Sequence, residues 1–505
     1  MQNQGEISFT YEQFLALIEV NKQVVEINKK QAFRIEQLEQ QLAQFKKMIF
    51  GSKHERVELL NSGQLSLDMN LGGITPIEPI TEDIAYTRTK TKENAHPNKS
   101  PLPADLPREI IEIAPDEDTT GMKLIGHEIT EQLEMTPAKF YVKQYKRAKY
   151  ARPEGNGVAI GKLPEFALPK AIAGSSVLNH LLVSKYVDHL PLHRQIKMFS
   201  RIGMTLSDST VNDWIIGSVN LLTALHDRQT HILLSSAYIQ NDETPIKVLD
   251  GEKKGQTHRG YFWVSHSPQQ KVVVFNYSKG RSAQFPTEFL KDYHGYLQTD
   301  GYGVYDTFQQ RNGITLVGCM AHARRYFVEA SGNDKQRSEY FIAQLQGLYH
   351  LEEGLRQSNA SSDEILTKRQ EVAMPILKHL HQWLKENITQ VLPQSTIGKA
   401  MGYALTRWDK LMQYAQDGIL LIDNNLIENQ IRPVAVGRKN YLFCGSHESA
   451  QRAAIIYSLI GTCKLNNVNP QDWLLDVLQK LPTRKANNID DLLPLNWNPE
   501  LQGVL

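Results

Sequence analysis

The sequence predicts a multidomain protein that combines α+β and α/β parts. The chain has 505 residues, 41% of them hydrophobic, which at about 150 residues per domain corresponds to roughly three domains. Residues 11–50 carry a sustained heptad pattern that is typical of one long helix. After about residue 236 the pattern changes from helical to short strand-like runs separated by turns. We therefore expect a helical N-terminal part followed by a mixed α/β core.

The composition excludes several classes of protein. With 56 basic and 55 acidic residues the net charge is +1, so a nucleic-acid surface would be a local patch rather than a basic coat. The three cysteines form no Cys-x-x-Cys pair, which excludes a disulfide framework and a cysteine-rich zinc finger. The first fifteen residues lack the features of a signal peptide, and no run reaches the length of a membrane span. We expect a cytoplasmic protein with no membrane partner.

Residues 11–50 predict an oligomerisation helix. With Phe14 at heptad position a, every a and d position from Ile35 to Ile49 is apolar. Asn21 and Asn28 fall at a, where asparagine fixes register and favours a defined dimer. The alternative is a surface helix of a globular domain. We favour a coiled coil that forms a homodimer.

The next two segments differ in composition. Residues 51–108 are assigned to a largely disordered linker, because Pro, Thr, Asn and Gly dominate them without a period. Residues 109–155 predict a small β module. Within it, 139–152 would form a basic strand interleaved with aromatic side chains, which suits a nucleic-acid backbone. A solvated edge strand protected by lysines is the equal alternative.

Residues 170–226 predict a helix-turn-helix region. A helix that ends at Gly203 is followed by a short turn, a cap at Ser207 and a second amphipathic helix. In that motif the second helix enters the major groove of DNA. Any helical hairpin has similar spacing, so the pattern alone is weak evidence.

The catalytic part is predicted between 236 and 450. Strand-like runs alternate with helices there, which indicates a mixed α/β sheet. Residues 334–418 are helical by pattern and interrupt this unit, and 451–505 form a helical C-terminal tail.

Three acids stand out within this part. Asp242 and Asp300 each follow an apolar run, so each is expected to close a strand. Glu428 lies on a helix predicted over 424–431, which Asp423 caps and Pro433 ends. Three such carboxylates can hold two divalent cations about 4 Å apart for phosphoryl transfer. Oxygen ligands favour Mg²⁺ or Mn²⁺ over zinc. For each acid by itself, an ordinary cap or turn residue is the alternative.

Several long motifs resemble one family. They run in the order FGSKHERV, VSKYVDHLPLHRQ, DETPIKV, TDGYGVYD, GCMAHARRYF, IENQIRPVAVGRKNYLFCGS and AAIIYSLIGTCKLNNVNPQDWLLDVL. Over nearly its whole length the chain resembles DDE transposases of the insertion sequence 66 family. The resemblance implies a ribonuclease-H-like fold with a helical insertion before the glutamate. It also implies a catalytic, metal-binding triad of Asp242, Asp300 and Glu428, with two Mg²⁺ or Mn²⁺ ions, which cleaves and joins transposon ends.

The resemblance assigns further roles. Cys319 and His322 match a Cys-x-x-His feature near the family's active site. Basic and polar residues beside the acids are expected to hold DNA phosphates: Arg324, Arg325, Arg432, Arg438, Lys439 and Asn440. Surface charge for the arginines and a core position for Cys319 are the alternatives.

One departure from the family concerns zinc. Family members often carry two Cys-x-x-Cys pairs around the small β module, but the corresponding stretches here contain no cysteine. We therefore expect no zinc in 109–155. The expected partners are double-stranded DNA (the inverted-repeat ends and the target) and a second copy of the chain. A need for accessory proteins of the same element stays open.

Two other functions remain at this point. One is a DNA-binding or assembly protein whose nuclease-like core is inactive, against which the presence of all three acids argues. The other is a stand-alone nuclease of the same fold. A requirement for paired ends and strand-joining activity would distinguish a transposase from it.

Overall fold

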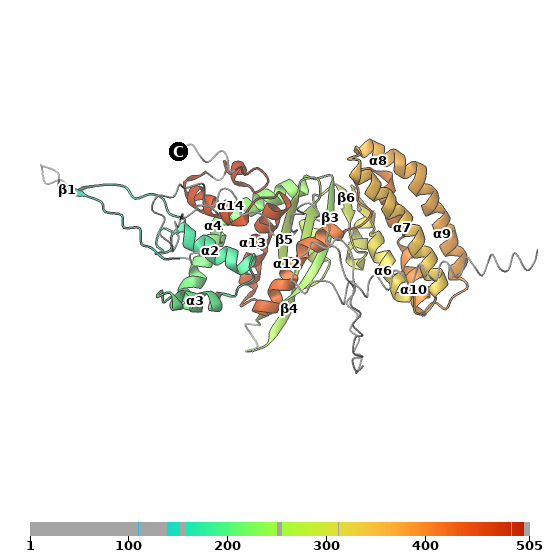
Figure 1. Cartoon of the computed structure of the whole chain (residues 1–505), viewed down its shortest axis with the longest axis horizontal. Helices are drawn as coiled ribbons and strands as arrows, with labels where there is room; N and C mark the ends of the chain where they lie inside the picture. The colour runs from blue at the N-terminus through green and yellow to red at the C-terminus, as the bar shows by residue number, and fades with distance from the viewer. Residues whose placement is uncertain are drawn as a thin grey trace, which may run out of the picture. The chain divides into compact units, whose positions relative to one another are not determined.

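The computed structural model describes residues 139–151, 158–249, 255–311, 313–485 and 487–498, together with Ile110. The chain divides into two units, 1–129 and 130–505, and all described residues except Ile110 belong to the second (Figure 1). The predicted coiled coil at 11–50 and the predicted linker at 51–108 therefore lie outside the described residues, as does most of 109–138.

A small antiparallel ribbon precedes the main body. Strand β1 (Lys149–Ala151) pairs with β2 (Val158–Ile160). The strand predicted over 139–152 is thus wrong for 139–148, which has no regular secondary structure. No strand of the described chain pairs with 139–148. The rings of Phe140 and Tyr145 contact those of Phe199 and Phe166.

Three helices follow the ribbon. They are α2 (Ser175–Tyr186), α3 (Leu192–Arg201) and α4 (Asp208–Leu234). As predicted, α3 ends before Gly203, whose φ of 87° suits glycine, and Ser207 caps α4 by accepting the amide of Thr210 at 3.1 Å. At 27 residues, however, α4 runs well beyond the predicted helix-turn-helix region.

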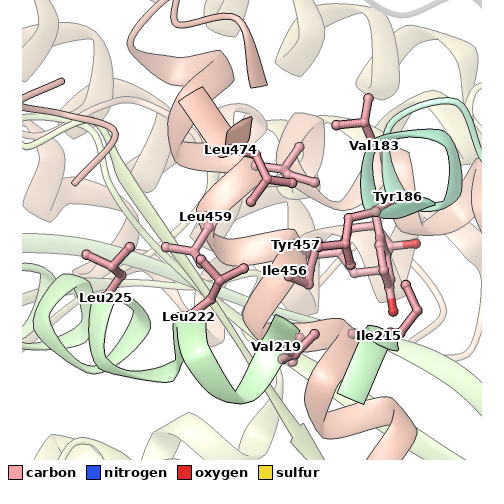
Figure 2. Close-up of a cluster of buried hydrophobic side chains, with 14 of the residues drawn as sticks. Val183, Tyr186, Ile215, Val219, Leu222, Leu225, Ile456, Tyr457, Leu459 and Leu474 are labelled. Atoms are coloured by element: carbon pink, nitrogen blue, oxygen red, sulfur yellow. The ribbon is translucent and has the colours of Figure 1, made fainter. Parts of the chain in front are cut away.

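Helix α4 is long because one of its faces is buried along its whole length. Its Val219, Leu222 and Leu225 lie opposite Ile456 and Leu459 of α13 (His447–Leu465) in one apolar cluster (Figure 2). Such packing, rather than helix propensity, supplies most of the stability of a helix in a protein.

A five-stranded mixed sheet forms the centre of the described chain. Its strands are β3 (Tyr238–Leu249), β4 (Thr257–Ser267), β5 (Val272–Ser278), β6 (Gly295–Gln298) and β7 (Ile314–Val317). They lie in the order β5-β4-β3-β6-β7. The pairs β3–β4 and β4–β5 are antiparallel, whereas β3–β6 and β6–β7 are parallel. The predicted mixed α/β sheet is thereby confirmed.

The outer edge of β5 is covered by α13. The amide of Phe275 donates to Oγ of Ser458 at 2.7 Å, and the amide of Val273 donates to Oγ1 of Thr462 at 3.1 Å. From α4, Nε2 of Gln229 donates to the carbonyl of Val273 at 2.7 Å. Side chains of two helices thus satisfy backbone groups that would otherwise be free at a sheet edge.

A helical segment separates α6 (Met320–Ala330) from the last part of the sheet domain. It contains α7 (Lys335–Gln357), α8 (Ser362–Lys368), α9 (Met374–Ile388), α10 (Thr396–Thr406) and α11 (Trp408–Met412). These helices occupy the stretch that the sequence predicts to be helical, and they bury a second apolar core together with α6, Tyr238 of β3 and Val317 of β7.

Helix α12 differs from its prediction. It spans Asn425–Tyr441 and contains Pro433, so the predicted end after Ile431 is wrong. A proline inside a helix removes one hydrogen bond at a cost of about 3 kcal/mol. Here Ile427, Val434 and Gly437 are buried on both sides of it, and this packing offsets the cost.

The chain continues through α13 to α14 (Pro470–Lys480). None of the helices in the described ranges is long and apolar enough to cross a membrane.

Candidate active site

The sheet register brings the first two acids together. Gln240 on β3 lies opposite Gln298, the last residue of β6. Continuing this register by two places puts Asp300 opposite Asp242. The prediction that Asp242 closes a strand is wrong, because β3 continues to Leu249 while pairing with β4. Asp300, in contrast, lies just beyond the end of its strand.

Asp242 lies among other carboxylates. Burial raises the pKa of its carboxyl group well above the usual range, and the negative charges of Asp300, Glu243 and Glu428 raise it further. One hydrogen bond opposes this shift, from the amide of Glu243 to Oδ1 of Asp242 at 2.7 Å. The three predicted acids therefore interact electrostatically.

The loop that carries Asp300 is held by its neighbours. Oδ1 of Asp300 accepts the amide of Tyr302 at 2.8 Å. The Tyr403 hydroxyl from α10 donates to the carbonyl of Asp300 at 2.7 Å. Arg407, between α10 and α11, donates to the carbonyl of Gly301 at 2.8 Å. The helical segment thus fixes the position of the second acid.

Glu428 lies in the first turn of α12, where the positive end of the helix dipole stabilises a carboxylate. Its side chain is 34% exposed, and its Oε1 lies 3.7 Å from Nε2 of His322 and 3.6 Å from a guanidinium nitrogen of Arg325. The N-cap position of this helix is Asn424 rather than the predicted Asp423, but Oδ1 of Asp423 accepts the amide of Asn425, the first residue of the helix, at 3.1 Å.

His322 and Cys319 lie beside the start of α12 but differ in character. Burial, followed by the charge of Arg325, lowers the pKa of His322, so the ring is neutral at pH 7. Cys319 is buried, and burial raises the pKa of its thiol to about 12. Its Sγ accepts the amide of Asn424 at 3.5 Å. The cysteine therefore holds the backbone as a neutral thiol, whereas His322 faces a candidate catalytic acid.

The predicted DNA-binding residues fall into two groups. Arg324 and Arg325 on α6, and Arg432 and Lys439 on α12, are exposed, and Asn440 is half-buried. Arg438 is different, because its guanidinium donates to Oγ1 of Thr244 at 3.1 Å and to the carbonyl of Pro245 at 2.8 Å. This arginine joins α12 to β3.

A second charged cluster next to Asp242 was not predicted. The Glu243 side chain is 1% exposed and accepts a hydrogen bond from Nε of Arg281 at 2.7 Å. The Tyr305 hydroxyl donates to the other Glu243 oxygen at 3.4 Å. The Arg281 guanidinium lies 3.8 Å from the centre of the Tyr302 ring. Because side chains alternate along a strand, Glu243 and Asp242 point to opposite faces of the sheet. Glu243 belongs to the DETPIKV motif and could have been noticed there, whereas no local sequence pattern indicated Arg281.

The donor set of the predicted triad consists of carboxylate oxygens, as Mg²⁺ and Mn²⁺ prefer. Within the described ranges, no three Asp, Glu, His or Cys side chains form a ready-made metal site. Magnesium, however, is usually held by only one or two carboxylates together with substrate phosphates and water. Asp242, Asp300 and Glu428 therefore fit a metal site that substrate completes, and a bound cation would relieve the repulsion that Asp242 experiences from the other two acids.

The part of the chain that forms the candidate site matches a known protein family. A family model described as "Transposase IS66 family" matches residues 170–452, which is more than half of the 505 residues. The chain belongs to the IS66 transposase family. A model of the IS66 C-terminal element matches residues 458–495. A third model, described as "Transposase C of IS166 homeodomain", matches residues 37–111. The predicted boundary between coiled coil and linker at residue 50 falls inside this last match.

Relatives of this IS66 family member extend over nearly the whole chain. Uncharacterized protein y4jD of Sinorhizobium fredii is 29% identical over 92% of this chain and 95% of its own length. Uncharacterized protein y4qI of the same organism is 30% identical over 90% of this chain and 87% of its own length. A shorter match is to uncharacterized protein YuaK of Escherichia coli, 44% identical over 10% of this chain and 51% of its own length.

Proposed function

We propose that this IS66 family member is a transposase that cleaves and joins DNA at the ends of its element. The observation that carries the proposal is the electrostatic interaction of Asp242 with both Asp300 and Glu428. They come from the middle of β3, the loop after β6 and the first turn of α12, and the other two acids raise the pKa of Asp242. Three carboxylates from separate elements suit metal-dependent phosphoryl transfer.

The order of the strands supports a ribonuclease-H-like core. Strand β4 is antiparallel to its neighbours β3 and β5, and these three strands are followed in the chain by β6 and β7. The latter two strands run parallel to β3 on its side away from β4. Under this proposal the acids on β3 and after β6 and the acid on α12 are the DDE triad, and the helices between α6 and α12 are its insertion.

The triad would hold two Mg²⁺ or Mn²⁺ ions. When bound, such ions activate the attacking oxygen and stabilise the leaving oxygen in an in-line displacement at phosphorus. Neutral His322 keeps Glu428 in place without supplying a competing positive charge. Arg325 and the exposed Arg324 and Arg432 lie where phosphates of the DNA end are expected to bind.

Other parts of the proposal rest on the sequence and the comparisons. The match to a homeodomain model at 37–111 supports a DNA-binding module in the N-terminal part. The heptads at 11–50 support a homodimer, which would bring two active sites to two DNA ends.

The test is cleavage of a plasmid that carries the DNA flanking the gene for this chain. Asp242→Asn, Asp300→Asn and Glu428→Gln should each lower the Mg²⁺-dependent cleavage rate by about a thousandfold or more, while binding of the DNA ends is retained. Asp292→Asn is the matched control, since Asp292 is an exposed acid before β6.

Two results would contradict the proposal. If all three variants cleave as fast as the wild type, the acids are not the catalytic groups. If the wild type binds DNA ends but shows no cleavage with either metal, the chain acts as a DNA-binding protein with an inactive core.

A further inference from the structure

Two buried glutamines lie on the strands that carry the first two acids. Gln240 precedes Asp242 by two residues on β3, and Gln298 precedes Asp300 by two residues at the end of β6. Both glutamine side chains are fully buried. Residues two apart on a strand face the same side, so Gln240 points to the face of the sheet on which Asp242 lies.

The two glutamines are bonded to each other and to one distant segment. Nε2 of Gln240 donates to Oε1 of Gln298 at 2.8 Å and lies 3.1 Å from the carbonyl oxygen of Asp423, to which it also donates. Nε2 of Gln298 donates to the carbonyl of Leu421 at 2.8 Å. Both bonds to the segment cross more than a hundred residues of sequence.

The segment they hold leads directly into α12. The carbonyl of Ile422, between the two carbonyls bonded by glutamine, accepts the amide of Met320 at 3.1 Å. Three consecutive carbonyls at 421–423 are therefore each bonded to the sheet or to the start of α6. Glu428 follows five residues after Asp423, in the first turn of α12.

We propose that Gln240 and Gln298 are positioning residues that set the place of Glu428 relative to Asp242 and Asp300. The chain reaches residue 421 only after the long helical segment α7–α11, so nothing in the local sequence holds α12 beside the acids. Arg438 joins the later part of α12 to β3. The glutamines supply a link just before Glu428, because each joins a strand that carries or leads to one acid to the segment that precedes the third. The catalytic meaning of this link rests on the proposed function.

The side-chain oxygens of both glutamines also have hydrogen-bond partners, which restricts the movement of the groups in this network. The Tyr238 hydroxyl donates to Oε1 of Gln298 at 2.5 Å, and Nδ1 of His266 lies 3.3 Å from Oε1 of Gln240. Fully satisfied buried networks rigidify the groups they connect, whereas a missing partner leaves a buried carbonyl unpaired. Loss of either glutamine amide should therefore loosen 421–430 before it unfolds the domain.

The experiment is hydrogen exchange of the full-length, metal-free protein, followed by mass spectrometry. Gln240→Met and Gln298→Met keep side-chain length but remove the amide. Each should speed exchange in peptides covering 421–430 by about tenfold, as expected when one buried hydrogen bond is lost. Peptides from α4 should exchange as in the wild type.

Gln229→Met is the matched control. Gln229 is also fully buried and donates to the carbonyls of Val273 at 2.7 Å and Ser458 at 3.1 Å, on β5 and α13 rather than on the strands or the segment that Gln240 and Gln298 join. Its loss should speed exchange around β5 and α13 and leave 421–430 unchanged. Gln240→Asn and Gln298→Asn serve if a methionine variant does not fold, because they keep the amide but shorten its reach.

Cleavage provides the second measurement. The half-saturating Mn²⁺ concentration should rise about tenfold in the Gln240 and Gln298 variants but not in the Gln229 variant. Unchanged exchange in 421–430 in all Gln240 and Gln298 variants would overturn the proposal. Faster exchange in a protein whose wild type does not cleave DNA would support the positioning role while contradicting the proposed function.

Discussion

Nε2 of His322 lies 3.7 Å from Oε1 of Glu428, and the two residues come from helices separated by the whole helical segment α7–α11. Both the neutral ring and the carboxylate are partly shielded from solvent, at 14% and 34% exposure of their side chains. The ring is therefore a short-range partner of the acid and limits the orientations that the carboxylate can adopt.

Replacing His322 should impair catalysis more than folding. We expect His322→Ala to lower the DNA cleavage rate by about 10- to 100-fold, the usual effect of losing a group that orients a metal ligand. The midpoint of thermal unfolding should move little. His350→Ala, at an exposed position on α7, is the control, and an equal rate loss in it would argue against a specific role for His322.

Glu243 and Arg281 should behave as a coupled pair. Arg281→Met leaves the buried Glu243 carboxylate without its main partner, whereas Glu243→Gln leaves a neutral group. Because Arg281 is 41% exposed, solvent screening reduces the expected loss of unfolding free energy to about 1–2 kcal/mol. The double variant should lose less than the sum of the single losses in urea unfolding. Strict additivity would show that the two side chains do not interact.

Arg438 and Lys439 are neighbours in sequence but should have different effects. Arg438→Met removes the bonds to Thr244 and Pro245, and it should lower the unfolding free energy by about 1–3 kcal/mol. Lys439→Ala should leave stability unchanged, weaken DNA binding and reduce the slope of log affinity against log salt concentration by about 1. Binding measured at several salt concentrations, beside thermal melts, separates the two. Normal melting of Arg438→Met with weakened DNA binding would reverse the assignment.

We expect the buried His266 side chain to lower the free energy of unfolding at acidic pH. Burial lowers the pKa of its ring from 6.5 to about 4. Between these values the unfolded chain binds the proton and the folded chain does not, so stability falls as pH decreases from 6.5 towards 4 and changes little from this source below that. The full contribution is about 3 kcal/mol.

Urea unfolding at pH 7.5 and pH 5 tests this prediction. His266→Gln cannot titrate and should lose less stability between the two pH values than the wild type. Other buried histidines such as His226 contribute equally to both proteins and cancel in the comparison. An identical pH dependence of the two proteins would mean that His266 is not the titrating group.

Local sequence patterns predicted some features of the site and missed others for physical reasons. The Ser207 cap, the start of α12 next to Asp423 and the strand that contains Asp242 were found because they depend on residues within a few positions. The helix through Pro433 was missed, since burial of Val434 and Gly437 against residues distant in the sequence outweighs a local penalty. Arg281 and the two glutamines were missed because their partners lie tens to hundreds of residues away.

The prediction of six DNA-contacting residues shows the same limit. Arg438 has the charge and the neighbours expected of a phosphate ligand. Only the tertiary structure reveals that its donors are directed to β3. The charged residues of the motif thus identified the expected DNA-binding region, but they did not show which side chains are free to bind phosphate and which have a structural role.

The hydroxyl groups of α13 on the edge of β5 have a consequence for synthesis of the protein on the ribosome. The amides of Val273 and Phe275 donate hydrogen bonds to Thr462 and Ser458, which are translated almost two hundred residues later. Until then the first three strands keep an open edge, and contacts of such long range form slowly. A nascent chain that already contains all three acids therefore lacks a closed domain, and a prematurely terminated product ending before α13 is expected to aggregate rather than cut DNA.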